Sequence, residues 1–134
     1  MKASYKKYTL NFKLPSGTSR GVLKTKETFF IIIENENQRG IGEGGLFRGL
    51  SIDDCPDYEA KLQWVCDHID LGIDELYNQL IAFPSIQMGL ETAFKSLSSK
   101  NLFKIYPSGF SNGNEKIPIN GLVWMGSEAF MKQQ

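Results

Sequence analysis

The hydrophobic period of this chain changes near Ser51, and this change limits most strongly the folds that it can adopt. Before Ser51 apolar and polar residues alternate, as Tyr8, Leu10 and Phe12 do within YKKYTLNFKL. Such alternation is typical of a strand with one solvated face. After Ser51 the apolar residues recur at helical spacing, as in PDYEAKLQWVCDHID, which is typical of an amphipathic helix. The sequence therefore predicts an α+β fold in which a small sheet precedes a helical group.

The first third of the chain predicts three strands, at 5–14, 27–34 and 40–47. The central strand, ETFFIIIE, is rich in β-branched and aromatic residues, which favour strands. A loop of about a dozen residues is expected over 15–26, because the letters PSGTS have turn chemistry and long loops are often functional. A short hairpin loop at 35–40 leads to the third strand. Together these elements predict a three-stranded antiparallel meander.

The middle of the chain predicts helices drawn from 56–70, 74–82 and 85–99. Pro56 suits a first helical position, with Asp54 near the cap of that helix. Asp74 and Ser85 are the expected caps of the second and third helices.

An apolar stretch near the end, KIPINGLVWMG, predicts a buried strand over 117–125, and the letters SEAFMKQQ after it predict the start of a helix. A buried strand needs neighbours on both edges, and none follows here. The expected organisation is a domain over 1–105, a linker over 106–116, and one βα unit over 117–134 that lacks its partners. An apolar strand with open edges is also a template for self-association.

Composition excludes several classes of partner. The 134 residues suit a single domain, and 15 basic residues balance 15 acidic ones, so no electrostatic footprint for nucleic acid or a membrane surface is present. The paired basic residues Lys24 and Lys26 are interpreted as lying on a solvated face.

The sequence also predicts a cytoplasmic protein. Its first residues lack the apolar core of a secretory signal, and its longest apolar run, FFIII, is too short to cross a bilayer. Cys55 and Cys66 lack the spacing of a metal or redox motif and are interpreted as free thiols.

Reactive side chains do not form a complete catalytic set. His68 is the only histidine, and no serine or cysteine stands in a nucleophile turn that it could serve. No zinc or calcium motif occurs. The clustered Asp53, Asp54 and Asp57 are interpreted as helix caps. The residues alone therefore predict neither catalysis nor a metal site.

Residues 40–45, GIGEGG, fit the pattern G-x-G-x-x-G, but their glycines lie in a predicted hairpin strand and open no helix. They are interpreted as sites where another backbone approaches closely, rather than as a dinucleotide fingerprint. Gly89 and Ala93 would likewise let a neighbour approach the third helix.

Two predicted loops, 15–26 and 45–51, lie at nearby ends of the sheet, and each carries an arginine, Arg20 and Arg48. Two interpretations stay open: both arginines are ordinary surface residues, or the two loops cover a carboxylate ligand.

Four stretches occur in an order that resembles the N-terminal capping domain of the enolase superfamily. They are TSRG at 18–21, GEGGLFRGLS at 42–51, FPSIQMGLETA at 83–93 and IPINGL at 117–122. The first two resemble its capping loops, and the last resembles its first barrel strand. Within the superfamily the last two resemble the o-succinylbenzoate synthase family most. The chain departs from the pattern after Gly42-Glu43, where a proline often follows and this chain has Gly44-Gly45.

This resemblance implies a lyase of menaquinone biosynthesis, which dehydrates 2-succinyl-6-hydroxy-2,4-cyclohexadiene-1-carboxylate to o-succinylbenzoate. Such enzymes carry a lysine pair as acid and base, and carboxylates that bind Mg²⁺, on a (β/α) barrel. Those positions would lie beyond Gln134, so the resemblance implies a truncated chain that covers the substrate and is inactive alone.

The resemblance also implies a set of residues that contact a small carboxylate substrate. The capping loops supply Ser19, Arg20, Phe47 and Leu50, and the barrel strand supplies Asn120 and Leu122, which share one side of that strand by parity.

Three alternatives remain open at this point. The parent enzyme could instead be an N-succinylamino acid racemase or dipeptide epimerase of the same superfamily. The chain could also be a free-standing module that binds a small acid, or a structural partner that adds its end strand to another sheet.

Overall fold

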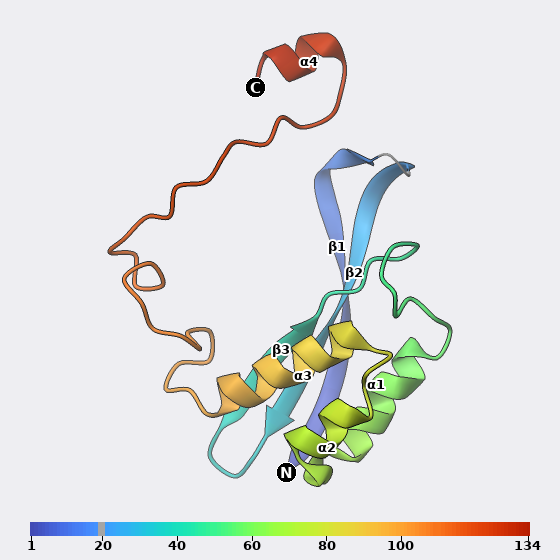
Figure 1. Ribbon diagram of the computed structural model, residues 1–134, viewed down its shortest axis with the longest axis vertical. Coiled ribbons are helices and arrows are strands. Elements are labelled where there is room, and N and C mark those ends of the chain that lie inside the picture. The colour runs from blue at the N-terminus through green and yellow to red at the C-terminus, as the bar shows by residue number, and fades with distance from the viewer. Residues whose placement is uncertain (19–20) are drawn as a thin grey trace.

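The computed structural model describes residues 1–18 and 21–134. Three strands come first, then three helices and a 3₁₀ turn, and a short helix closes the chain (Figure 1). The elements are β1 Lys2–Thr18, β2 Gly21–Glu34, β3 Arg39–Gly44, α1 Tyr58–Asp67, the 3₁₀ helix η1 Ile69–Leu71, α2 Ile73–Asn78, α3 Pro84–Leu97 and α4 Glu128–Lys132.

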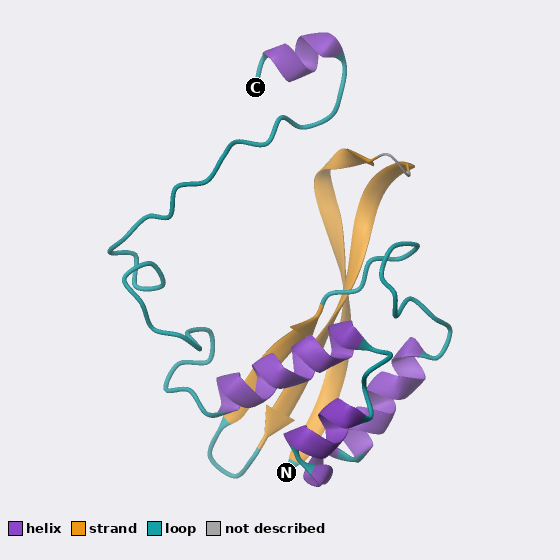
Figure 2. Cartoon of the chain, in the orientation of Figure 1, coloured by secondary structure: helices purple, strands orange, loops and turns teal. Residues whose placement is uncertain are grey.

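The sheet has the order β1-β2-β3, and both pairs of neighbours are antiparallel. Helices α1, α2 and α3 lie on one face of this sheet (Figure 2). The predicted α+β meander followed by helices is therefore confirmed.

The predicted loop at 15–26 is wrong, because β1 and β2 continue through most of it. Ser16 pairs with Leu23 and Gly17 with Val22, after a register shift that begins at Asn11. The irregular stretch contains Pro15, where a missing N–H removes no ladder hydrogen bond. The outer parts of β1 and β2 form a long two-stranded arm that extends beyond the helices (Figure 1).

Helix starts also differ from the predictions. The first helix begins at Tyr58, not Pro56, and Asp57 precedes it. Gly72, rather than Asp74, occupies the cap position of α2. Helix α3 begins with Pro84, because proline suits the first turn, where its missing N–H has no helical partner.

The core lies between the sheet and the helices, and Phe29 and Tyr58 meet at its centre with ring centroids 5.0 Å apart. Each fully buried large apolar side chain contributes roughly 1.5–3 kcal/mol. The completely buried core residues are Phe29, Ile31, Ile33, Leu46, Leu62, Val65, Leu76, Leu80, Ile86, Leu90 and Ala93.

Helix α3 packs directly against the backbone of β3. A Cβ atom on Gly42 would lie 1.8 Å from the carbonyl oxygen of Gly89, and one on Gly40 would lie 2.2 Å from that of Ala93. Only a hydrogen fits at these two strand positions. The interpretation of these glycines as sites of close backbone approach is confirmed.

The stretch from 98 to 127 leaves the helices and returns towards the outer arm (Figure 1). The predicted strand at 117–125 is wrong, since this segment is extended but pairs with no described strand. Backbone pairing needs a neighbouring strand, and none lies beside it. Trp124 Nε1 donates to the carbonyl of Pro15 at 3.4 Å, and the predicted terminal helix is present as α4, capped by Ser127.

Among the described residues, no helix has the length and apolar composition needed to cross a bilayer. Both cysteines, Cys55 and Cys66, are free thiols, as predicted.

Candidate functional site

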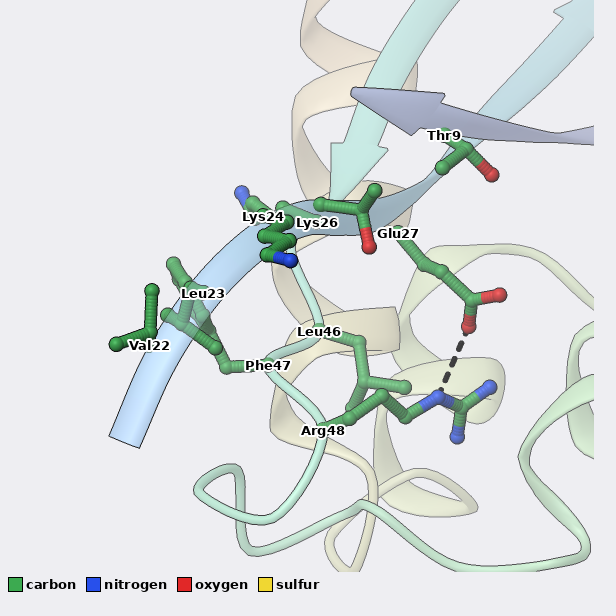
Figure 3. Close-up of a pocket in the computed structure, with 10 residues that line it drawn as sticks. Thr9, Val22, Leu23, Lys24, Lys26, Glu27, Leu46, Phe47 and Arg48 are labelled. Carbon is green, nitrogen blue, oxygen red and sulfur yellow. Dashed lines mark hydrogen bonds and ion pairs between the residues drawn. The ribbon is translucent and has the colours of Figure 1, made fainter. Parts of the chain in front are cut away.

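A hollow of about 570 Å³ lies between β2 and the loop that follows β3. Figure 3 shows side chains from β1, β2 and this loop around it. We call it the β2 hollow. Its lining residues are Thr9, Val22, Leu23, Lys24, Thr25, Lys26, Glu27, Leu46, Phe47 and Arg48.

Lys26 and Phe47 form a cationic and aromatic wall of the β2 hollow. The Nζ atom of Lys26 lies 4.8 Å from the centroid of the Phe47 ring, within the range of a cation–π contact. The same Nζ is 3.8 Å from Glu43 Oε1, and the side chain of Lys26 is only 19% exposed. Thr28 Oγ1 donates to Glu43 at 2.6 Å. Lys26 therefore packs against the loop, which corrects its interpretation as a solvated residue.

A chain of ion pairs links β1, β2, the loop and α1. Lys7 Nζ lies 3.0 Å from Glu27 Oε1 and 2.9 Å from Glu59 Oε1. Arg48 Nε donates to Glu27 Oε2 at 2.9 Å, the contact drawn in Figure 3. Arg48 Nη1 then donates to Asp54 Oδ1 at 2.8 Å. We call these five residues the charge chain.

The charge chain favours the ionised form of its carboxylates. Hydrogen bonding from Lys7, with help from Arg48, lowers the pKa of Glu27. The backbone N–H of Gly49, followed by Arg48, lowers the pKa of Asp54. Each acid is stabilised as an anion by the donors that hold it. Arg48 is therefore a surface arginine, 45% exposed, whose guanidinium is engaged by Glu27 and Asp54.

The loop turns tightly around Phe47. The N–H of Phe47 donates to Ser51 Oγ at 2.9 Å, and its carbonyl accepts from the N–H groups of Leu50 and Ser51 at 3.1 and 2.9 Å. Gly49 has a φ of +72°, a left-handed conformation that favours glycine. Both backbone polar groups of Phe47 are therefore used inside the turn.

Asp53 ties the other end of the loop to α3. It is 2% exposed, and its Oδ2 accepts from the backbone N–H and the Oγ of Ser85 at 2.8 and 2.6 Å. Tyr58 OH lies 2.7 Å from the same Ser85 Oγ. Burial raises the pKa of Tyr58 to about 12. Asp53 therefore caps α3 rather than the expected first helix, whereas Asp54 binds Arg48 and Gly49.

Of the six residues expected to contact substrate, Phe47 alone lines the β2 hollow among those the structure describes. It is 37% exposed. Leu50 is 59% exposed on the outside of the turn and lines no part of the hollow. Asn120 and Leu122 lie exposed on the segment after α3, away from the hollow. Ser19 and Arg20 lie outside the described residues.

Sequence reasoning missed Lys26 and Glu27 as lining residues. The alternation of VLKTKETF could have extended the second strand and placed both beside the loop. His68 lies at the C-terminal cap of α1, with Nδ1 2.8 Å from the carbonyl of Trp64. No three histidine, cysteine or acidic side chains in 1–18 and 21–134 gather in a way that could hold a metal ion.

The sequence is similar over its whole length to o-succinylbenzoate synthase from Desulfotalea psychrophila (strain LSv54 / DSM 12343). The two are 31% identical over 168 aligned positions, which take in 100% of this chain and 45% of that protein. The chain is homologous to o-succinylbenzoate synthase of the enolase superfamily. It spans less than half the length of that relative, and no protein-family model matches it.

Solved structures give the same result. MenC from Desulfotalea psychrophila LSv54 superposes with a TM-score of 0.74 at 25% identity, over 99% of this chain and 44% of that one. Because the superposition covers 99% of this chain, it includes the extended stretch after α3.

Two other structures share the fold at lower identity. The o-succinylbenzoate synthase of Thermosynechococcus elongatus BP-1, solved with Mg in its active site, has a TM-score of 0.64 at 22% identity, over 75% of this chain and 31% of that one. A mandelate racemase/muconate lactonizing protein from Herpetosiphon aurantiacus has a TM-score of 0.56 at 16% identity, over 71% and 29%.

Proposed function

We propose that this chain is the substrate-covering part of a Mg-dependent dehydratase that forms o-succinylbenzoate from 2-succinyl-6-hydroxy-2,4-cyclohexadiene-1-carboxylate. The observation that carries this proposal is the 31% identity to an o-succinylbenzoate synthase across the entire chain. In this proposal residues 1–105 form the capping domain, 106–116 the linker, and 117–134 the first unit of a (β/α) barrel.

The β2 hollow gives the capping domain a surface suited to an acid with an apolar body. Val22, Leu23 and Phe47 offer apolar contact, and Lys26 offers a cation beside the aromatic ring. A lysine at an apolar wall attracts a carboxylate, while the wall excludes water from the reacting end. Ser19, Arg20, Asn120 and Leu122 remain predicted substrate contacts in the complete enzyme.

Proton removal and metal binding are assigned to the barrel and not to these residues. The side chains described here do not fit Mg²⁺, because no group of three potential ligands occurs among them. The residues of this chain are expected to enclose and orient the substrate, which is a separate contribution to the rate.

The test is a capping fusion, in which residues 1–116 of this chain replace the corresponding part of the Desulfotalea psychrophila enzyme and precede its barrel. We expect the purified fusion to form o-succinylbenzoate and the 134-residue chain alone to form none. The unaltered Desulfotalea enzyme is the positive control.

A folded fusion without dehydratase activity would contradict the proposal. The same fusion is assayed for racemisation of N-succinylamino acids and epimerisation of dipeptides, which separates the alternatives within the superfamily. Activity on those substrates alone would replace the proposed reaction with one of them.

A further inference from the structure

Hydrogen bonds within the loop between β3 and α1, and from this loop to α3, hold it in place. Its first anchor is the closed turn, in which Ser51 Oγ accepts from the N–H of Phe47 at 2.9 Å. Its last anchor is Asp53, which is buried and accepts two hydrogen bonds from Ser85 at the start of α3. Within the loop, Asp54 Oδ2 also accepts from the N–H of Gly49 at 2.6 Å.

Arg48 is the one side chain among the described residues that joins this loop to β2 by ion pairs. Its Nε binds Glu27 of β2 at 2.9 Å and its Nη1 binds Asp54 of the loop at 2.8 Å. Glu27 is itself fixed by Lys7 of β1 at 3.0 Å. The guanidinium donates in two directions from one rigid plane, a geometry that a flexible ammonium does not reproduce.

Phe47 directly precedes Arg48, so a guanidinium bound to Glu27 and Asp54 restrains the backbone that carries the aromatic ring. The ring faces Lys26 of β2 at 4.8 Å, on the side of the loop that lines the β2 hollow (Figure 3). The side chains of the neighbouring Leu50 and Ile52 are exposed, at 59% and 88%.

We propose that Arg48 is a positioning residue that locks Phe47 against β2, so that the loop 45–54 is a preformed wall of the substrate hollow. This inference rests on the proposed function for its consequence in catalysis. A wall that is ordered before binding spares the complex the entropy cost of ordering it, and therefore favours affinity and selectivity for substrate shape.

The first test uses hydrogen exchange of the 134-residue chain and needs no activity. Exchange of the Gly49 amide is compared in the unaltered chain, in Arg48→Met and in Asp54→Asn. We expect exchange at Gly49 and Leu50 to accelerate roughly ten- to a hundredfold in both variants, the range for loss of one hydrogen bond to a charged group. Core amides such as that of Ile31 should be unchanged.

Arg39→Met is the matched control, because Arg39 pairs with Glu34 at the far end of the sheet. It should leave exchange at Gly49 unaltered. Asp54→Asn keeps the shape of the side chain. It therefore tests the positioning of the loop by Arg48 even if Arg48→Met lowers the folded fraction. Unchanged exchange at Gly49 in Asp54→Asn would overturn the proposal.

The second test measures steady-state kinetics of the capping fusion. Arg48→Met should raise KM about tenfold and leave kcat within roughly twofold, since a displaced wall removes binding shared by ground and transition states. Arg48→Lys should not restore KM, because two-directional donation is lost. An unchanged KM would overturn the positioning role. An inactive fusion whose Gly49 amide is still protected would contradict the proposed function and leave the lock intact.

Discussion

At the scale of single residues, the chain uses one buried hydroxyl network to connect three segments. Asp53, Ser85 and Tyr58 come from the loop, α3 and α1, and their polar atoms meet within 2.6 to 2.8 Å. A buried polar group without a hydrogen-bond partner would lower the free energy of unfolding. Among the described residues, no buried side-chain polar atom lacks a partner, so the network stabilises the loop at no such cost.

The raised pKa of Tyr58 predicts that the folded chain loses stability at alkaline pH. Burial raises its pKa from 10.0 to about 12, so the folded chain favours the neutral phenol. The contribution of Tyr58 to the free energy of unfolding is complete below its pKa in the unfolded chain. It is lost as the pH rises from there through its pKa in the folded chain. Urea unfolding at increasing pH should show this decline, and Tyr58→Phe should abolish most of it. The exposed Tyr77→Phe is the control, and an equal alkaline decline in Tyr58→Phe would refute the assignment.

Because Phe47 lines the β2 hollow, its removal is expected to lower kcat/KM. Phe47→Ala in the capping fusion should lower kcat/KM about ten- to a hundredfold, since burying a large apolar side chain is worth roughly 1.5–3 kcal/mol. Ile52→Ala is the control, because Ile52 is 88% exposed and lines no part of the hollow. If both variants keep the kcat/KM of the parent fusion, Phe47 makes no contact with substrate.

At the scale of elements, the contact between β3 and α3 fixes the position of the helical group on the sheet. Glycines on both elements let the two backbones meet, and Ser96 Oγ accepts from the N–H of Ile41 at 3.1 Å across this contact. The site depends on this contact, because Asp53 anchors the loop to the start of the same helix.

Gly42→Ala should destabilise the chain strongly. Its Cβ would lie 1.8 Å from the carbonyl oxygen of Gly89, so the helix must shift, and such overpacking costs about 1–3 kcal/mol. Gly121→Ala is the matched control, since a Cβ there meets nothing within 4 Å. Thermal unfolding measures this difference. Equal melting temperatures for the two variants would rule out the close packing of β3 against α3.

The sequence predicted elements well where local pattern and tertiary contacts agree. The run Phe29–Ile33 is a strand because its residues favour strands and alternate ones, Phe29, Ile31 and Ile33, also face the core. The turn residues near Pro15 favoured a loop, but pairing with β2 overrode them, and the apolar letters of 117–125 gave no information on whether a neighbouring strand is present. Phe47 could be predicted from its motif, whereas Lys26 could not, because its orientation depends on contacts 17 and 21 residues away, with Glu43 and Phe47.

At the scale of the whole molecule, the packed sheet and helices differ sharply from the stretch that follows them. Apolar side chains of that stretch lie in water, among them Ile119 and Leu122 at 86% and 77% exposure. Trp124 contacts the outer arm through the carbonyl of Pro15. In the proposed function a barrel would bury these side chains.

The chain by itself is therefore expected to associate with further copies as its concentration rises. Burial of each such side chain is worth roughly 1.5–3 kcal/mol, and an extended apolar segment with free edges favours pairing. Sedimentation should show oligomers that weaken in the double variant Leu122→Lys, Trp124→Lys. Ile52→Lys, which changes an exposed residue of the loop, should not weaken them. A monomer at every concentration would contradict this expectation.

The central claim is that this domain covers the substrate of an o-succinylbenzoate-forming barrel, and a crystal structure of the capping fusion with bound o-succinylbenzoate tests it most directly. The product is expected to contact the β2 hollow, with the Phe47 ring within about 4 Å of it and Arg48 still bound to Glu27 and Asp54. A product enclosed by barrel residues alone, without contact to any residue of 1–54, would contradict the account.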